Sequence, residues 1–217
     1  MNSRMLTLSL ATGLFLVALM TLDAVGTWPL PGNQQGYEPL QPIAYSHRVH
    51  AGELQIDCLY CHHGAKTSRH AGIPSSDICM NCHKFVTASL GAVRAEDDLA
   101  QEENRRPREV VSPELAKLYL TLAVDEKRQV NAEREGRPVE WVQVHNLPDY
   151  VYFDHRAHVG VGVRCQTCHG PVETMERVRQ SADLSMGWCV NCHRTATENG
   201  IAGKQVDASI DCVTCHY

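Results

Sequence analysis

Five copies of the pentapeptide Cys-x-x-Cys-His constrain this chain of 217 residues more than any other feature. They contain all ten cysteines, whereas chance at this composition predicts about 0.025 copies. The pattern is the attachment motif of c-type haem: two thiols bond to the two vinyl groups of one haem, and the adjacent histidine binds the iron. The sequence therefore predicts five covalently bound haems. The motifs are, in chain order, Cys58, Cys61 and His62; Cys79, Cys82 and His83; Cys165, Cys168 and His169; Cys189, Cys192 and His193; and Cys212, Cys215 and His216.

Other uses of paired cysteines fit these motifs less well. A zinc site can be built from two Cys-x-x-Cys pairs, but it needs no histidine directly after each pair. A disulfide scaffold in an exported protein would also leave the five histidines unexplained. The chain has 3 Phe, 7 Tyr and 3 Trp to fill a core, so we expect haem to fill much of the interior. A net charge of −5 without a Lys/Arg-rich tract argues against nucleic acid as a partner.

The N-terminal region contains an uncharged apolar stretch, residues 5–22, between Arg4 and Asp23. As a helix it would be about 27 Å long, enough to span a bilayer core. The charges at its two ends predict a transmembrane anchor with the N-terminus in the cytoplasm. The alternative is a cleaved signal peptide, with 24–26 as the best cleavage site. In both cases we expect the haem region on the periplasmic, extracytoplasmic side of the cytoplasmic membrane.

An internal repeat organises the remainder of the chain. The segment 45–50 (YSHRVH) precedes the first motif, and 153–158 (FDHRAH) precedes the third. Each segment is followed by two motifs, so we predict two dihaem modules and a fifth haem at the C-terminus, an arrangement typical of an electron wire. The predicted divisions are an anchor (1–26), a linker (27–44), a first module (45–85), an insertion with one helix (86–144), and a second module with the fifth haem (145–217).

The insertion contains no cysteine. Its charged segment 96–108 indicates a solvated surface loop. After it, Ser112-Pro113-Glu114 provides an N-cap, a first-turn proline and an acid, and leucines follow at helical spacing. This pattern predicts a helix over roughly residues 113–130. The expected fold class is mainly α with extensive irregular structure, a haem-packed core and one N-terminal transmembrane helix.

Seven histidines lie outside the motifs, enough to give every haem iron a second axial ligand. The first histidine of each repeat segment can fold back over the haem that follows it. We therefore assign His47 to the first haem and His155 to the third. His50 and His158 lie three residues further on and are expected to bind neighbouring haems.

The remaining candidate ligands are less closely tied to one motif. His145 is the expected fifth ligand, while His63 and His70 compete for the second haem. Met186 is the thioether nearest a motif, and if it bound iron that haem would have a higher potential. Iron with both axial positions filled has no open position for a substrate, so we expect electron transfer and no substrate-turnover site.

Four segments carry a family resemblance: 45–52, 78–83, 144–153 and 184–189. The His-x-x-His pair ahead of Cys-x-x-Cys-His resembles the class III multihaem cytochromes c. In that class, the first histidine of the pair serves the following haem and the second serves another. The segments more closely resemble the pentahaem cytochrome subunit of alternative complex III, a quinol-oxidising respiratory complex. A related hexahaem subunit of a menaquinone reductase complex shares these four segments. The predicted count of five haems favours alternative complex III over that complex.

This resemblance implies an electron-transfer subunit rather than a catalytic one. Its partners would be quinol-oxidising membrane subunits and an iron–sulfur subunit, with a monohaem cytochrome c or an oxidase as acceptor. Two other classes of protein stay open. A multihaem reductase of nitrogen or sulfur oxyanions would need a five-coordinate haem, and a free-standing quinol dehydrogenase would deliver electrons to a periplasmic reductase.

Overall fold

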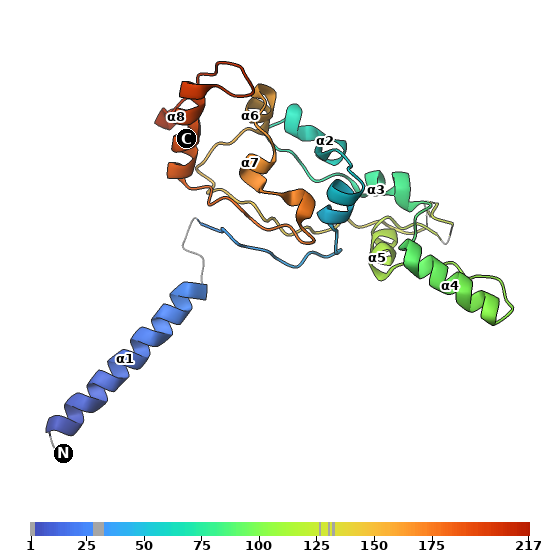
Figure 1. The fold of residues 1–217 in the computed structure, drawn as a ribbon, viewed down its shortest axis with the longest axis horizontal. Coiled ribbons are helices and arrows are strands. Elements are labelled where there is room, and N and C mark those ends of the chain that lie inside the picture. Colours follow the sequence, from blue (N-terminus) through green and yellow to red (C-terminus); the bar gives the residue numbers. More distant parts are fainter. Residues whose placement is uncertain (1–2, 28–32, 126, 130, 132) are drawn as a thin grey trace.

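The computed structural model describes residues 3–27, 33–125, 127–129, 131 and 133–217 (Figure 1). These residues form helices, single helical turns and irregular chain, with no β-strand among them and two isolated bridges, 151 to 216 and 201 to 204. The mainly helical and irregular fold class is therefore confirmed. The elements are α1 (Ser3–Thr27), η1 (Arg48–Glu53), α2 (Cys58–Cys61), η2 (His63–Lys66), α3 (Ser76–His83), α4 (Leu90–Glu102), α5 (Pro113–Thr121), α6 (His155–Val161), α7 (Gln166–His169), η3 (Val172–Thr174), α8 (Met186–Asn199) and α9 (Cys212–Cys215).

Helix α1 covers the apolar N-terminal stretch. Large apolar side chains are exposed along it, among them Leu8, Leu14 and Phe15. Within the described residues, however, no helix combines the length and the apolar character that crossing a membrane requires. The expected helix is therefore present, but the expected transmembrane crossing is not found. Residues 28–32 of the expected linker 27–44 lie outside the described part of the chain.

The insertion contains two helices rather than the one expected. Helix α4 begins after Ser89, whose hydroxyl accepts a hydrogen bond from the backbone of Ala92 at 3.3 Å. The first half of the charged segment 96–108 lies in this helix, so the prediction of a loop was wrong there. Asp97, Asp98 and Glu102 do face solvent, but from a helix surface, whereas Glu96 is partly covered and paired with Arg105. The serine ahead of Leu90 was the N-cap signal that the sequence offered.

Helix α5 starts as predicted and ends early. The Ser112 hydroxyl accepts from the backbone of Leu115 at 3.2 Å, and Pro113 occupies the first turn. The helix ends at Thr121, because Ala123 adopts a positive φ of 51° that an α-helix cannot continue through. The predicted extension to residue 130 was therefore wrong.

The helices after α1 follow one another along the length of the molecule. Figure 1 shows α4 and α5 at one end, then α3 and α2, then α7 and α6, with α8 and the C-terminus at the other end. Buried apolar side chains are few in the described residues: Ala65, Ala100, Leu118, Ala123, Val124, Met175 and Ala196. Most of them belong to the insertion, so the motif segments pack few large side chains against one another.

Candidate haem-binding sites

Each of the five motifs lies on, or at the start of, a short helical segment. The segments are α2, α3, α7, α8 and α9. Residues three and four positions apart share one face of a helix, so both thiols and the imidazole project to the same side in the second and fourth motifs, which lie wholly in α3 and α8. His62 and His216 follow the last residue of α2 and α9 in non-helical conformations. Two of these helices begin at a side-chain cap. Asp57 accepts from the backbone of Leu59 at 2.8 Å, and Ser185 accepts from that of Trp188 at 3.2 Å.

The ten motif thiols are unpaired and differ in exposure. Three of them are exposed, namely Cys58, Cys82 and Cys212. The other seven are half-buried, namely Cys61, Cys79, Cys165, Cys168, Cys189, Cys192 and Cys215. None of the ten is fully buried by the protein itself, so each is open to a haem vinyl group.

Cys82 is one of the exposed thiols. It lies on the last turn of α3, next to His83, and its carbonyl oxygen accepts from the backbones of Phe85 and Val86 at 3.0 and 2.9 Å. A thiol has to be accessible to react with a vinyl group, so the exposure of Cys82 is compatible with haem attachment. Its role as the second thiol of the second haem stays a prediction.

The first repeat places a histidine opposite each of the first two motif histidines. The ring centres of His47 and His62 lie 6.5 Å apart with their planes at 6°. Those of His50 and His83 lie 6.0 Å apart at 61°. His47 thus faces the motif that follows it, and His50 faces the second motif of the module.

The second repeat reproduces this pairing. His155 and His169 have ring centres 6.3 Å apart and planes at 8°. His158 and His193 are 6.0 Å apart, with planes at 38°. The nearly parallel pair comes first in both modules, and the tilted pair comes second. The structure therefore brings together the histidines that the repeat suggested.

These separations suit a haem between the rings. Two imidazoles that bind one iron at about 2 Å from opposite sides have ring centres roughly 6 Å apart. In the described part of the chain, no three His, Cys, Asp or Glu side chains converge on one point as a bare metal ion would require. The donor set consists of two facing imidazoles with two thiols beside one of them, which fits c-type haem.

Hydrogen bonds orient most of these rings. A ring whose Nδ1–H donates to a carbonyl oxygen keeps its Nε2 lone pair free for iron. Six histidines place Nδ1 within 2.5–3.0 Å of a main-chain carbonyl oxygen. They are His50 (Ser46), His62 (Gly72), His83 (Val86), His155 (Arg69), His158 (Asp154) and His193 (Ser209).

Burial also favours the neutral form of two of the facing imidazoles. Burial, followed by the nearby His62 and His50, lowers the pKa of His47 to about 4. Burial, followed by the neighbouring His145 and His155, lowers the pKa of His169 to about 3. A neutral imidazole is the form that binds a metal.

An aromatic residue inside each repeat contacts both of its histidines, a role that was not predicted from the sequence. Tyr45 stacks on His50 at 4.4 Å and meets His47 edge-on at 4.9 Å. Phe153 does the same for His158 at 4.6 Å and for His155 at 4.9 Å. An aromatic residue two positions before each His-x-x-His pair was the available signal.

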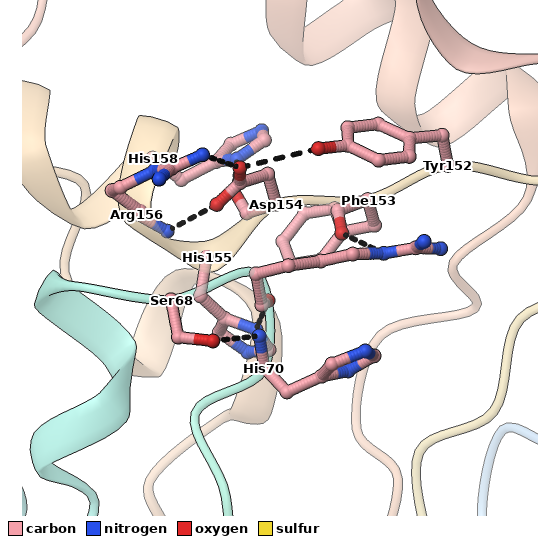
Figure 2. Close-up of polar contacts among 9 residues, drawn as sticks. Ser68, His70, Tyr152, Phe153, Asp154, His155, Arg156 and His158 are labelled. Atoms are coloured by element: carbon pink, nitrogen blue, oxygen red, sulfur yellow. Dashed lines mark hydrogen bonds and ion pairs between the residues drawn. The ribbon is translucent and has the colours of Figure 1, made fainter.

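In each repeat, the residue that follows the aromatic side chain caps the helical turn that carries the two histidines. Figure 2 shows Asp154, which is 8% exposed, accepting from the backbone of Arg156 at 2.9 Å and from the Arg156 guanidinium at 2.8 Å. The hydroxyl of Tyr152 reaches the same carboxylate at 3.4 Å. Ser46 holds the equivalent position in the first repeat, and its hydroxyl accepts from Val49 at 3.2 Å. These caps fix the start of each histidine pair.

The other candidate ligands lie apart from the four pairs. His145 Nε2 contacts the Nδ1 of His169 at 3.3 Å, so this histidine touches a motif histidine rather than facing one across a gap. His63 and His70 are exposed, and no ring contact in the described residues joins either to a motif histidine. Met186 is 69% exposed at the start of α8. The ring of His216 lies 5.8 Å from that of Tyr150, at 29°.

Neighbouring motifs also contact one another. The Asn81 amide of the second motif donates to the Tyr60 hydroxyl of the first at 2.8 Å. Burial and a hydrogen bond with the Cys165 thiol of the third motif raise the pKa of Cys58. Burial and the nearby thiols of the fourth motif raise the pKa of Cys168 to about 11. The pKa of Cys189 in the fourth motif is likewise raised by burial and by Cys215 of the fifth. A hydrogen bond thus joins the second motif to the first, and cysteines of the first and third, third and fourth, and fourth and fifth motifs lie near enough to affect one another's pKa.

Comparison with known proteins agrees with this donor set. Residues 151–217 match the family described as cytochrome c7 and related cytochrome c. Over 222 aligned residues the chain is 24% identical to the multiheme cytochrome c subunit of menaquinone reductase from Nitratidesulfovibrio vulgaris, covering 93% of this chain and 88% of the relative. The chain is a multihaem cytochrome c that takes part in electron transfer. Its cytochrome c7-like domain implies covalently bound c-type haems, and their number of five stays a prediction.

Proposed function

We propose that this chain is an electron-conducting subunit that holds five c-type haems through its ten motif cysteines. The observation that carries the proposal is the set of four facing histidine pairs, each with ring centres 6.0–6.5 Å apart. In this proposal the axial pairs are His47/His62, His50/His83, His155/His169 and His158/His193, and His216 binds the fifth iron. When bound, each haem supplies a one-electron iron couple.

The proposed electron path follows the motif contacts from the second haem, beside the insertion, through the first, third and fourth haems to the fifth. The Asn81–Tyr60 hydrogen bond supports the first step of this order. The step between modules is supported by the backbone of His155, which donates to the Arg69 carbonyl at 3.1 Å and so ties α6 to the segment after η2. The division into two dihaem modules is part of the same proposal.

We propose that its partners are the subunits of a quinone-linked membrane complex. The menaquinone reductase relative supports partners of this class. The predicted count of five haems favours an assembly of the alternative complex III type, with an iron–sulfur subunit and a monohaem cytochrome c or an oxidase as acceptor. A free-standing conduit to a periplasmic reductase is the alternative.

The proposed location is the extracytoplasmic face of the cytoplasmic membrane. Attachment of c-type haem outside the cytoplasm supports this side of the membrane. The exposed apolar side chains of α1 and the quinone-linked partners would hold the chain there. Carbonate extraction of membranes tests this attachment: the full chain should stay with the membrane fraction unless its partners are removed and residues 3–27 are deleted.

Two measurements test the function. Intact mass of the purified holoprotein should equal the processed chain plus five haems, and electron paramagnetic resonance should show at least four low-spin haems with two histidine ligands. Native mass spectrometry of the protein extracted from its own membranes in mild detergent should show polytopic quinone-site subunits and an iron–sulfur subunit. A solitary pentahaem chain would favour the free-standing conduit, and a chain with fewer haems would contradict the proposed cofactor set.

A further inference from the structure

One motif histidine, His169, differs in its hydrogen bonding from three of the others. His62, His83 and His193 direct Nδ1 to main-chain carbonyl oxygens. His169 instead directs Nδ1 to a side chain, the Nε2 atom of His145, at 3.3 Å. The two rings meet edge-on, with centres 4.3 Å apart and planes at 75°. The pairs His47/His62 and His155/His169 have similar ring geometry, with planes at 6° and 8°. They differ in the Nδ1 partner of the motif histidine, and also at the opposite ring, where His155 Nδ1 lies 3.0 Å from the Arg69 carbonyl and His47 Nδ1 is buried without a hydrogen-bond partner.

The position of His145 does not suit an axial ligand. His155 lies on the far side of the gap that His169 faces, so both sides of the third site already have an imidazole. His145 contacts the Nδ1 edge of His169, whereas iron would be bound at Nε2. Its own Nε2, the atom most often used to bind a metal, is engaged in that contact.

The segment that carries His145 is held firmly in place. The Gln41 side chain forms two hydrogen bonds with the backbone of Val142, at 3.0 Å as donor and 2.9 Å as acceptor. The Gln143 amide donates to the His145 carbonyl at 3.0 Å and to the Asn146 side chain at 3.3 Å. A ring fixed here can accept a hydrogen bond through Nε2.

We propose that His145 is a positioning residue for the third haem: its Nε2 accepts the Nδ1–H of His169, orients that ring and increases its electron donation to iron. The inference rests on the proposed haem function. It replaces the expectation that His145 is the fifth distal ligand. An imidazole nitrogen is a stronger hydrogen-bond acceptor than a main-chain carbonyl, and a more strongly donating axial ligand favours ferric iron. The third haem should therefore have a lower reduction potential than the first.

The test compares His145→Phe, which keeps a ring without an acceptor, with His145→Gln, which keeps an acceptor oxygen. Both are made in the full holoprotein, and His70→Phe is the matched control at an exposed histidine. Intact mass first establishes that each variant carries as many haems as the wild type. A spectroelectrochemical titration then resolves the redox components, and electron paramagnetic resonance counts low-spin haems.

In His145→Phe we expect one component to shift to higher potential, the other components to stay in place and the low-spin count to be unchanged. His145→Gln should recover at least half of that shift, and His70→Phe should show none. Conversion of one haem to high spin in His145→Phe would make His145 an iron ligand and overturn the inference. An unshifted component, or no recovery with glutamine, would also overturn it. If the phenylalanine variant does not accumulate, His145→Leu provides the acceptor-free side chain.

The inference and the proposed function fail in different ways. A wild-type chain that lacks five haems by intact mass contradicts the proposed function. A wild-type chain with five haems and unchanged potentials in His145→Phe contradicts only the role of His145.

Discussion

The haem-motif segments and the insertion at 86–144 are stabilised by different means. In the insertion, Leu118 is 5% exposed and Ala100 is 1% exposed, and Glu96 accepts hydrogen bonds from Arg105 and from the Arg108 backbone. In the motif segments the buried apolar side chains are small or single, and histidines face one another across gaps of about 6 Å. Side-chain packing therefore stabilises the insertion, whereas in the proposed function covalent and axial bonds to haem would stabilise the motif segments.

The two regions meet at the second motif. The Tyr119 hydroxyl donates to the His83 carbonyl at 2.6 Å, and the Arg128 guanidinium donates to the Lys84 carbonyl at 2.7 Å. These bonds satisfy carbonyl groups at the C-terminal end of α3, which a helix leaves without internal partners. The insertion therefore supports the site at one end of the proposed electron path.

The largest expected effect comes from removing haem. A full chain with all ten motif cysteines changed to serine should show no cooperative thermal transition, because the motif segments have little side-chain core of their own. Hydrogen exchange should show unprotected amides in α2, α3, α7 and α8, with residual protection confined to α4 and α5. A cooperative transition with protected motif helices would contradict the contrast between the two regions.

Replacement of one distal histidine should have the next largest effect. His47→Met and His155→Met should each raise the potential of one haem by roughly 0.1 V or more, because a thioether donates less to ferric iron than an imidazole. Intact mass should show that all haems remain attached, since the thioether bonds are untouched. A redox titration in which no component moved would show that the substituted histidine is not a ligand.

A core change in the insertion should affect stability but not potentials. Leu118→Ala should lower the free energy of unfolding of this region by about 2–5 kcal/mol, because it leaves a cavity where the side chain was buried. Leu120→Ala is the control on the same helix, since Leu120 is 73% exposed and its loss should cost little. Hydrogen exchange in α4 and α5 measures the effect. A shift in haem potentials as large as that of the ligand variants would contradict the separation of the two regions.

The smallest effect concerns the acid sensitivity of the insertion. Hydrogen bonds from the Arg105 side chain and the Arg108 backbone lower the pKa of Glu96 to about 2, against an ordinary value of 4.5. Because the folded pKa is the lower one, Glu96 contributes its full stability above about pH 4.5, and this contribution is lost as the pH falls towards 2. In Glu96→Gln, exchange protection of α4 should fall less between pH 5 and pH 2.5 than in the wild type. Asp97→Asn is the control, and an equal change in both variants would contradict the assignment to Glu96.

Much of the site could be predicted because it depends on short spacings. The Cys-x-x-Cys-His motifs place their donors within one helical turn, and the His-x-x-His repeat suggested pairs that the structure brings to 6.0–6.5 Å. The helix at 113–121 followed from its proline and cap. The charged helix α4 was missed because a solvated helix and a solvated loop have similar compositions.

The role of His145 could not be predicted because it depends on a contact across 24 residues of chain. The sequence showed seven spare histidines for five irons, and counting alone made His145 a ligand. Only the tertiary structure, through the Gln41–Val142 hydrogen bonds, places its Nε2 against His169.

Thiols and imidazole at fixed local spacing predict the cofactor chemistry from a few adjacent residues, without reference to the fold. Which histidines face each other within each module becomes visible only in the folded chain. Ligand pairing and motif order depend on how distant segments, held by main-chain hydrogen bonds and by the packing of Tyr45 and Phe153, come together.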